Sequence, residues 1–496
     1  MAWLDLIGRP SRVAIAVVIA LVVLAVLLLT TGMKILVWPD SIAYLGPPLD
    51  ALTTGTFTHW GGRGFGYPAW LWAVLSWRFQ VADVIVGQRA LVLFTGLALG
   101  CAIVVTSRPV AHRPAVALLA GFWMLVYVLY PPVIGLAHAI MPETLFAFVL
   151  SLIVLAVTVA LSSDTSRGAA IAATVVTGIA AAALVVVKPH ATLLAAFLIA
   201  ALPWPGPPPR RRDRIWALGA SVVLAGVLVI LPESVLQERY DARASQLFGP
   251  QSLFCNNADL VQSSLDSNDP FERTVRESLG AILSPEARRR ASDWTLLGFN
   301  GDACMYGEPP RLVDAHFPDA NAAVAFYQRT YIRAALARPQ HVLARLVRHA
   351  ADFAYKPFNA VTTAYFFTAT PSMMSVDFSH QSVLKRWYAD DPGRFDGLVS
   401  LPTRRWLMPL RVLFVCAGTL LIASSVVAAF LTPNDALRQT FLILLGCALS
   451  INVLIAIVHT FEPRYMAMQT PLLAAVGFAG SLAIMEWIRR RFSAVA

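Results

Sequence analysis

The sequence predicts an all-α polytopic membrane protein with about ten transmembrane helices and a mainly helical extracytoplasmic soluble domain. Hydrophobic residues make up 57% of the 496 positions and charged residues only 14%, whereas a soluble domain carries about 25% charged residues. The mean hydropathy is +0.64. Long apolar runs recur along the chain with polar clusters between them, which is typical of repeated membrane spans.

The first predicted span is 12–33. It is too long for the core of a signal peptide, and no A-x-A-like cleavage site follows it. Arg9 and Arg12 precede it, so we expect a cytoplasmic N-terminus.

Residues 34–83 form a predicted first outer loop with two amphipathic pieces, Asp40 to Leu52 and Tyr67 to Trp77. Tryptophan and tyrosine favour the membrane–water interface, so we expect these pieces to be helices that lie on the surface. The linker THWGGRGFGYP between them has four glycines and can bend sharply.

The remaining spans follow from the apolar runs. They are 84–106, 114–133, 142–161, 169–187, 190–203, 215–232, 406–431, 439–458 and 466–487. The run 190–203 is shorter than the ~20 residues of an upright span, so we expect a short or tilted crossing. Ten crossings place both chain ends in the cytoplasm.

In this topology the basic residues are distributed unequally between the two sides of the membrane. The short outer loops hold five of them, Lys34, Arg63, Arg78, Lys188 and Arg464. The cytoplasmic segments hold thirteen, namely Arg9, Arg12, Arg108, Arg113, Arg167, Arg210, Arg211, Arg212, Arg214, Arg438, Arg489, Arg490 and Arg491. This asymmetry is the one that sets membrane orientation.

The predicted domains are a transmembrane module 1–232, a soluble outer domain 233–405 and a second transmembrane module 406–496. Helical patterns in the outer domain include Ala320 to Leu336 and His341 to Tyr355. Its charges balance at 19 basic and 19 acidic residues, so the net charge of +10 lies in the membrane part. That location favours contact with anionic membrane lipids and argues against nucleic acid as a partner.

The five cysteines fall into two groups. Cys101, Cys416 and Cys447 lie in apolar runs, where cysteine behaves as a small hydrophobe. Cys255 and Cys304 lie in the outer domain, where a disulfide and a pair of free thiols are both compatible with the sequence. No CxxC or His-rich spacing indicates structural zinc.

Four polar clusters interrupt the apolar pattern at predicted outer helix ends. They are Asp40 in PDSIAYL, Glu143 in MPETLFAF, Lys188 to His190 in VKPH, and Glu462 to Tyr465 in EPRY. We expect these clusters to meet in one cavity at the outer membrane boundary, beneath the soluble domain.

Each acid has a structural and a functional interpretation. Asp40 is either a helix N-cap, which contributes about 1 kcal/mol, or a general base that takes a proton from an acceptor hydroxyl. Glu143 either complements a helix dipole or has a functional role, in which it binds sugar hydroxyls or orients a base. An acid near hydrocarbon tends to have a polar partner.

The basic and aromatic residues of the clusters have two interpretations as well. Lys188 either snorkels outward at a turn or contacts a phosphate. Arg464 either pairs with Glu462 or clamps a phosphate bidentately. The remaining substrate-binding candidates are His190, Tyr465, His59 and Arg63.

The order of these motifs resembles that of the GT-C superfamily of membrane glycosyltransferases. Within it, the chain is similar to the protein O-mannosyltransferase and lipid A aminoarabinose transferase branch. The resemblance rests on PDSIAYL, the long first loop, MPETLFAF, VKPH and FEPRYMAMQTPLL, and it covers most of 12–205 and 406–488.

The resemblance implies an inverting sugar transfer from a polyprenyl-phosphate donor to a lipid, glycan or protein acceptor. Asp40 would be the catalytic base, with Lys188 and Arg464 near the phosphate. Many relatives place two adjacent acids in the first loop, whereas Ser41 follows Asp40 here. No cofactor or metal is expected, and a divalent cation stays open. The expected location is a bacterial inner (plasma) membrane, with the site on the periplasmic face.

Two other functions are alternatives to sugar transfer. A lipid-linked oligosaccharide polymerase or ligase predicts arginine-rich outer loops rather than an early aspartate. A lipid or glycan transporter predicts inverted repeats and polar residues at mid-membrane depth, and the sequence contains neither pattern.

Overall fold

The computed structural model describes residues 11–32, 35, 39–57, 62–110, 114–289, 301–348, 383, 386, 404–431, 435–458 and 463–493. These residues form helices and no strand. Seven of the described helices are long and apolar enough to cross a membrane, and the shorter apolar helices are Pro114–Val128, Pro189–Ala201 and Val412–Ala428. Each coincides with one of the ten predicted spans, which confirms an all-α, multi-pass membrane protein.

Helix α1 (Arg12–Thr30) illustrates how an apolar sequence builds this bundle. Val17 and Leu24 are buried against neighbouring helices. On the other face, Val18 and Val22 are each 57% exposed. A helix that is apolar all round and only half covered by protein requires a lipid environment for its outer face.

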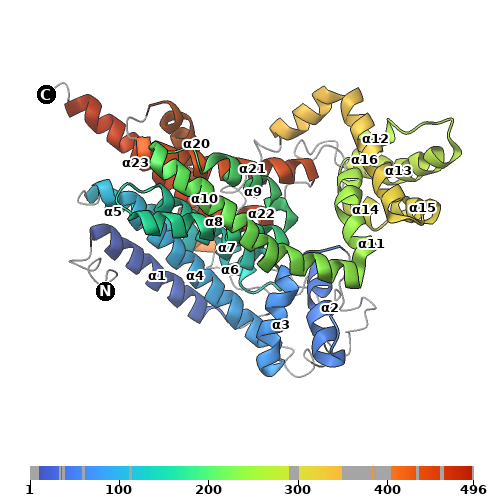
Figure 1. The fold of residues 1–496 in the computed structure, drawn as a ribbon, viewed down its shortest axis with the longest axis horizontal. Helices are drawn as coiled ribbons and strands as arrows, with labels where there is room; N and C mark the ends of the chain where they lie inside the picture. The colour runs from blue at the N-terminus through green and yellow to red at the C-terminus, as the bar shows by residue number, and fades with distance from the viewer. Residues whose placement is uncertain are drawn as a thin grey trace.

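The long helices of the bundle pack side by side. Helix α7 (Glu143–Leu161) contacts α4 (Val81–Ser107) and α8 (Arg167–Val187). Helix α23 (Thr470–Ser493) packs against α5 (Pro114–Val128), α20 (Arg404–Leu431) and α21 (Asp435–Val458). The first and last helices of the chain therefore belong to one bundle (Figure 1).

The predicted span 114–133 is divided in the structure. Helix α5 ends at Val128, and a short helix α6 (Pro131–Leu136) follows. Pro131 and Pro132 cannot donate the backbone hydrogen bonds that would continue α5. The segment up to α7 is buried, as irregular backbone at membrane depth must be.

The short crossing at 190–203 is a helix of ten residues, α9 (Thr192–Ala201), after the 3-10 turn η3 (Pro189–Ala191). At about 1.5 Å per residue it extends only about 15 Å. In the polar turn that precedes it, Lys188 is buried and Pro189 is exposed.

One long helical path leads from the bundle to the outer domain. It comprises α10 (Pro208–Ala225), the π-helical turn η4 (Gly226–Ile230) and α11 (Leu231–Cys255). Pro232 lacks an N–H and its ring crowds the preceding turn, which explains the wider π turn just before it. The helix crosses the predicted domain boundary at 232–233 without a break.

The outer domain has its own hydrophobic core, formed by α11 and five further helices. Phe254, Phe326 and Tyr327 lie at its centre. The helices are α12 (Ala258–Gln262), α13 (Pro270–Arg289), α14 (Gly301–Met305), α15 (Glu308–His316) and α16 (Ala320–Ala337). Helix α16 matches the predicted helix 320–336; the predicted helix 341–355 is described only to residue 348. Figure 1 shows this domain opposite the end of α23.

A buried arginine ties the outer domain to the bundle. The Arg345 guanidinium donates to both Asp259 carboxylate oxygens, at 2.8 and 2.7 Å, and to Asn257 Oδ1. The Asn257 amide donates in turn to the Ile457 carbonyl at the end of α21, at 3.2 Å. Because Arg345 is only 7% exposed, this network fixes how the domain contacts the membrane helices.

The two predicted surface helices are α2 (Pro39–Thr54) and α3 (Gly66–Arg78). Both are helical, and neither is a candidate span. They are more deeply packed than a surface location predicts, because Leu49, Tyr67 and Leu71 are completely buried. Trp77 is 85% exposed, so only the outer face of α3 is available for membrane contact.

The opposite end of the bundle carries arginines, and we call it the arginine end. Arg167 forms a bidentate ion pair with Asp213, at 2.7 and 2.6 Å. Arg210 donates to the carbonyls of Ser162 and Ser163. These bonds join the ends of α7, α8 and α10 at the side predicted to be cytoplasmic.

Candidate functional site

Polar side chains from six separate stretches of the chain line one cavity of about 90 Å³. We call it the cationic cavity. It lies where α2, the 62–64 loop, the end of α8 and the start of α22 (Pro463–Ala467) meet the outer domain. Its lining residues are Asp40, Tyr44, Gly62, Arg63, Gly64, Val187, Lys188, Pro189, His190, Phe248, Ser252, Asn256, Met305, Tyr306, Arg464 and Tyr465.

Asp40 lies between two arginines in this cavity. Arg63 Nη2 donates to Oδ1 at 2.6 Å, and Arg464 Nη1 donates to Oδ2 at 2.8 Å. Helix α2 begins at Pro39, so Asp40 lies inside the first turn and is not the N-cap. Its carboxylate binds side chains far away in the sequence.

The electrostatics of Asp40 follow from this geometry. Burial opposes ionisation, but the charges and hydrogen bonds of Arg63 and Arg464 outweigh it and hold the Asp40 pKa well below its ordinary value. The carboxylate is therefore ionised at neutral pH and, in this state, is a weak base.

Glu143 and Lys188 form a buried ion pair beside this clamp. Lys188 Nζ donates to Glu143 Oε1 at 2.7 Å, and the two side chains are 8% and 0% exposed. Arg464 Nε lies 3.9 Å from the same oxygen. Glu143 is the first residue of α7, so it also complements the helix dipole. It holds two cations at the floor of the cavity.

Glu143 does not use both of its carboxylate oxygens. Among the residues that the structure describes, Oε2 is buried and has no hydrogen-bond partner. A second cavity of about 10 Å³ adjoins Glu143 together with Thr144 and Tyr127. That volume approaches the smallest that holds one water, which would satisfy the oxygen.

The Tyr465 ring lies beneath the cations. Lys188 Nζ is 4.6 Å and Arg464 Cζ is 5.3 Å from its centroid, within the range of cation–π attraction. The His190 ring lies 5.4 Å from it at a tilt of 41°. Tyr465 thus provides an aromatic ring against which both cations of the cavity floor pack.

Two glycines thread Arg63 into the cavity. Gly62 has φ +70°, and a Cβ there would lie 2.4 Å from the Ala244 carbonyl oxygen. A Cβ on Gly64 would lie 2.0 Å from the Val186 carbonyl oxygen. No side chain fits between α11 and α8 at these positions, so the linker is wedged rather than free.

The loop after Arg63 is tied to α11. The Phe65 N–H donates to both Glu233 carboxylate oxygens at 3.1 Å, and the Gln237 amide donates to Oε1 at 2.6 Å. Glu233 is only 9% exposed. The first outer loop is therefore held by the same helix that leads to the outer domain.

Aromatic residues support Arg63 from the other side. Its Cζ lies 4.9 Å from the Tyr44 ring centroid, and Tyr44 packs edge-on against Tyr67 at 5.4 Å. Gln88 of α4 donates to the Tyr67 hydroxyl at 2.9 Å and to the Ala139 carbonyl at 2.7 Å. Burial raises the pKa of Tyr44, so its hydroxyl stays neutral.

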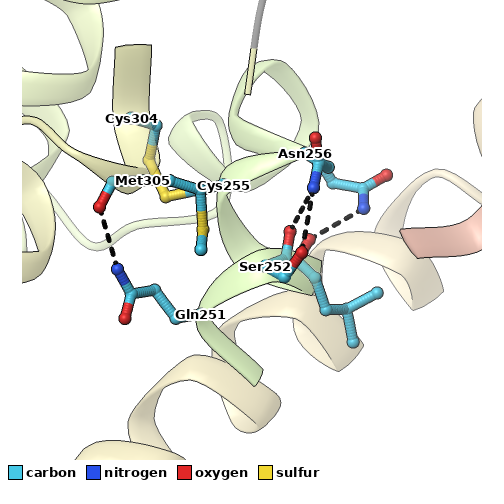
Figure 2. The surroundings of a disulfide bond; sticks show 8 residues. Gln251, Ser252, Cys255, Asn256, Cys304 and Met305 are labelled. Atoms are coloured by element: carbon cyan, nitrogen blue, oxygen red, sulfur yellow. Dashed lines mark hydrogen bonds between the residues drawn. A yellow bond between two sulfur atoms is a disulfide. The ribbon is translucent and has the colours of Figure 1, made fainter. Parts of the chain in front are cut away.

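The outer domain contributes one wall of the cavity, held by a disulfide (Figure 2). Cys255 and Cys304 are bonded, with Cα atoms 5.3 Å apart, which decides between the two states that the sequence left open. Asn256 and Met305, the residues that follow them, line the cavity. Asn256 donates to the Ser252 carbonyl at 2.9 Å, and Gln251 donates to the Met305 carbonyl at 3.0 Å. This wall is neutral, in contrast to the cationic floor.

The structure brings seven of the nine predicted site residues together. Asp40, Arg63, Lys188, His190, Arg464 and Tyr465 line the cavity, and Glu143 lies directly behind Lys188. His59 and Glu462 lie outside the described residues, so the predicted pairing of Glu462 with Arg464 stays a prediction.

Sequence reasoning missed several lining residues. Tyr44 is one helical turn after Asp40, and that spacing places both on the same face, so it could have been found. The outer-domain residues Phe248, Ser252, Asn256 and Tyr306 carry no local signal. Only the packing of that domain on the bundle reveals them.

The formal charge of the site decides what it can bind. Arg63, Lys188 and Arg464 contribute three positive charges, and Asp40 and Glu143 contribute two negative charges. The resulting single positive charge favours a monoanion such as a phosphodiester. Within the described part of the chain, no group of three or more His, Cys, Asp or Glu residues could hold a metal ion.

A third cavity, of about 240 Å³, lies among α20, α21 and α23 and is mostly apolar. Four of its lining side chains, Ile422, Val426, Leu449 and Val453, are 41% to 60% exposed. We call it the apolar groove. Gln469 links it to the cationic cavity, because its amide donates to Asn452 Oδ1 of the groove at 2.8 Å and to the Tyr465 carbonyl at 3.0 Å.

Comparison with known proteins gives weak similarity only. No family model and no curated protein matches the chain. Among solved structures, ArnT from Cupriavidus metallidurans bound to undecaprenyl phosphate is 14% identical, with a TM-score of 0.37, over 95% of this chain and 77% of that chain. The apo state of ArnT is also 14% identical, with a TM-score of 0.36, over 94% and 77%.

Because both TM-scores are below 0.5, the function of this chain is inferred from the cavity itself.

Proposed function

We propose that this protein is an integral membrane glycosyltransferase of the GT-C type. It transfers a sugar from a polyprenyl-phosphate donor to an extracytoplasmic acceptor, with inversion at the anomeric carbon. Asp40 is the general base, and Lys188 and Arg464 bind the donor phosphate. The location is the inner membrane of a bacterium, with the cavity on the periplasmic face.

The observation that carries this proposal is the meeting of three cations and one partly exposed carboxylate at the end of a membrane bundle. A lipid-linked phosphate needs cations at membrane-boundary depth. An attacking hydroxyl needs a base beside the phosphate. A net charge of +1 matches a donor phosphodiester, which carries one negative charge.

The reaction follows from these positions. The acceptor oxygen attacks the anomeric carbon, and the bond from that carbon to the phosphate oxygen breaks. The electron pair of the broken bond stays on the phosphate, where Lys188 and Arg464 stabilise the growing charge. The acceptor proton moves to the Asp40 carboxylate. Holding both substrates in line accounts for much of the rate.

The polyprenyl chain lies in the apolar groove in this proposal. The groove is open to the lipid-facing surface of α20 and α21, and the Gln469 hydrogen bonds connect it to Tyr465 on the floor of the cationic cavity. A donor with its phosphate at Arg464 then has an apolar path for its tail within the same helix group.

Sugar transfer by the purified full-length protein tests the proposal. The assay reconstitutes the protein with lipid extract that contains polyprenyl-phosphate sugars and measures sugar movement to an acceptor fraction. We expect Asp40→Asn to lose at least about a hundredfold in rate, the lower end for removal of a general base. Asp83→Asn, which removes a carboxylate on the surface of α4 that pairs with Arg78, should act as wild type.

The outcome separates the enzyme from its rivals. A transporter moves the donor across the membrane and retains that activity in Asp40→Asn. A polymerase or ligase transfers whole glycan chains, so the product mass identifies it. Full sugar transfer by Asp40→Asn would refute the role of Asp40 as base.

A further inference from the structure

The three basic side chains Arg63, Lys188 and Arg464 of the cationic cavity are each paired with a carboxylate of the protein. Asp40 pairs with Arg63 at 2.6 Å and with Arg464 at 2.8 Å. Lys188 pairs with Glu143 at 2.7 Å. A phosphate that enters must therefore compete with one of these two carboxylates.

The two carboxylates differ in how readily they can be displaced. Glu143 is 0% exposed and lies behind Lys188, so a ligand in the cavity cannot take its place. The Asp40 side chain is 24% exposed and lines the cavity itself. Its two oxygens each accept a hydrogen bond from one guanidinium, which is also how two oxygens of a phosphate are held.

We propose that the donor phosphate displaces the Asp40 carboxylate from Arg464 and Arg63 and takes its place between them. This inference rests on the proposed function and deepens it. The displaced carboxylate remains in the cavity without its guanidinium partners, beside the acceptor hydroxyl. Binding of the donor is thus the event that converts Asp40 from an ion-pair partner into a base.

The electrostatics of Asp40 support this exchange. Burial raises the Asp40 pKa, and only Arg63 and Arg464 bring it below its ordinary value. When a phosphate takes over these guanidinium groups, burial remains and the lowering causes weaken. The proton affinity of Asp40 then rises at the step that needs a base.

Transfer of the proton to Asp40 keeps the charge of the site matched to that of the phosphate throughout the reaction. Before transfer, the net positive charge of the site meets a singly charged phosphodiester. After transfer, the polyprenyl phosphate is a monoester with a charge of about −1.5 to −2. Protonation of Asp40 gives the site a second net positive charge, which matches this product.

Binding of undecaprenyl phosphate to the full-length protein in lipid nanodiscs tests the exchange without any turnover. Asp40→Asn removes the competing charge and keeps the side-chain shape, so we expect at least about tenfold tighter binding than wild type. Asp40→Glu keeps a carboxylate and should not tighten binding. Asp83→Asn should bind as wild type, and Lys188→Met should bind more weakly. Asp40→Ser replaces Asp40→Asn if the latter does not fold.

The outcomes separate the inference from the proposed function. If wild type binds and Lys188→Met weakens binding, but Asp40→Asn binds no tighter than wild type, the exchange is refuted and the phosphate site stands. If neither wild type nor any variant binds undecaprenyl phosphate, the exchange and the proposed function are both refuted.

Discussion

At the scale of single residues, the site consists of two acids with different tasks. Asp40 faces the cavity between Arg63 and Arg464, whereas Glu143 is enclosed behind Lys188. A carboxylate at the cavity surface can exchange partners, and one that is fully buried serves to position the cations. The sequence identified both acids, but it could not assign these tasks because exposure depends on tertiary packing.

The buried pair predicts a stability effect. Glu143→Gln leaves Lys188 without a countercharge in a nearly dry environment, so we expect a loss of about 3 kcal/mol in the free energy of unfolding. The double variant Glu143→Gln with Lys188→Met also removes the unpaired positive charge, so it should recover part of the lost free energy of unfolding. Thermal unfolding in detergent measures both.

The control for this pair is Asp213→Asn at the exposed arginine end, where water screens the ion pair with Arg167. It should unfold close to wild type. A Glu143→Gln variant as stable as Asp213→Asn would show that Lys188 does not need Glu143.

The low pKa of Asp40 predicts a pH profile. A carboxyl whose pKa lies below the ordinary value of about 3.9 is ionised throughout the range from about pH 5 to pH 8. The value of kcat/KM reports the free enzyme, so Asp40 should cause no fall in it as pH drops through this range. The value of kcat reports the donor complex and should fall toward low pH if the phosphate has taken the arginines.

The other charged groups that face Asp40 are Arg63, Arg464 and, more distantly, Lys188 and Glu143, and Tyr44 stays neutral. His190 also lines the cavity, and histidine is the side-chain type whose charge commonly changes near neutral pH. The profile is therefore measured in His190→Gln. If kcat and kcat/KM fell equally toward low pH in His190→Gln, the predicted difference between the two profiles would be wrong.

At the scale of elements, short segments between helices place the site. The Gly62–Gly64 loop is wedged between α8 and α11, and the Lys188–His190 turn joins α8 to α9, which has only ten residues. The glycines and the short apolar run were visible in the sequence. The neighbours that make them necessary, such as Val186 and Ala244, were not.

The wedged loop predicts that Gly64→Ala is disruptive. Its Cβ would lie 2.0 Å from the Val186 carbonyl oxygen, so the loop must shift and withdraw Arg63 from Asp40. We expect both a lower unfolding temperature and reduced sugar transfer. Gly219→Ala in α10 has nothing within 4 Å of its new Cβ and serves as the control. Wild-type transfer by Gly64→Ala would rule out a need for this loop geometry.

The disulfide predicts a separate effect on the neutral wall. Cys255→Ser with Cys304→Ser opens a loop with a sequence separation of 49, which costs about 4 kcal/mol of stability in the chain-entropy model. Because Asn256 and Met305 belong to the wall and not to the cationic floor, we expect a higher KM for the acceptor and unchanged binding of undecaprenyl phosphate. If the double variant weakened the binding of undecaprenyl phosphate as much as that of the acceptor, the wall would also hold the donor.

The matched control for the disulfide is Cys101→Ser with Cys416→Ser. These thiols are free and exposed on the bundle, far in sequence from the wall. Their replacement should change neither stability nor the acceptor KM.

At the scale of the whole molecule, the cationic cavity and the arginine end lie at opposite ends of the bundle. The cavity joins α2, α8 and α22 beneath the outer domain, whereas Arg167 and Arg210 join α7, α8 and α10 at their other ends. This polarity agrees with the orientation that the charge asymmetry predicts.

Cysteine labelling from one side of the membrane checks this polarity. Thr54→Cys at the exposed end of α2 should react with an impermeant maleimide added outside intact cells. Arg212→Cys at the arginine end should react only after the cells are opened. Labelling of both from the same side would contradict the topology and place the cavity in the wrong compartment for a periplasmic acceptor.

The sequence by itself determined the class of membrane protein, the ten apolar segments and most of the ionisable groups that line the cavity, and it predicts an orientation that the labelling experiment tests. These follow from hydropathy and charge, which are local properties of the chain. Only the tertiary structure decided which groups are partners: Asp40 with Arg464, 424 positions away, Glu143 with Lys188, and a wall from the outer domain. Such pairings depend on how helices pack across long sequence distances, and no local pattern encodes that packing.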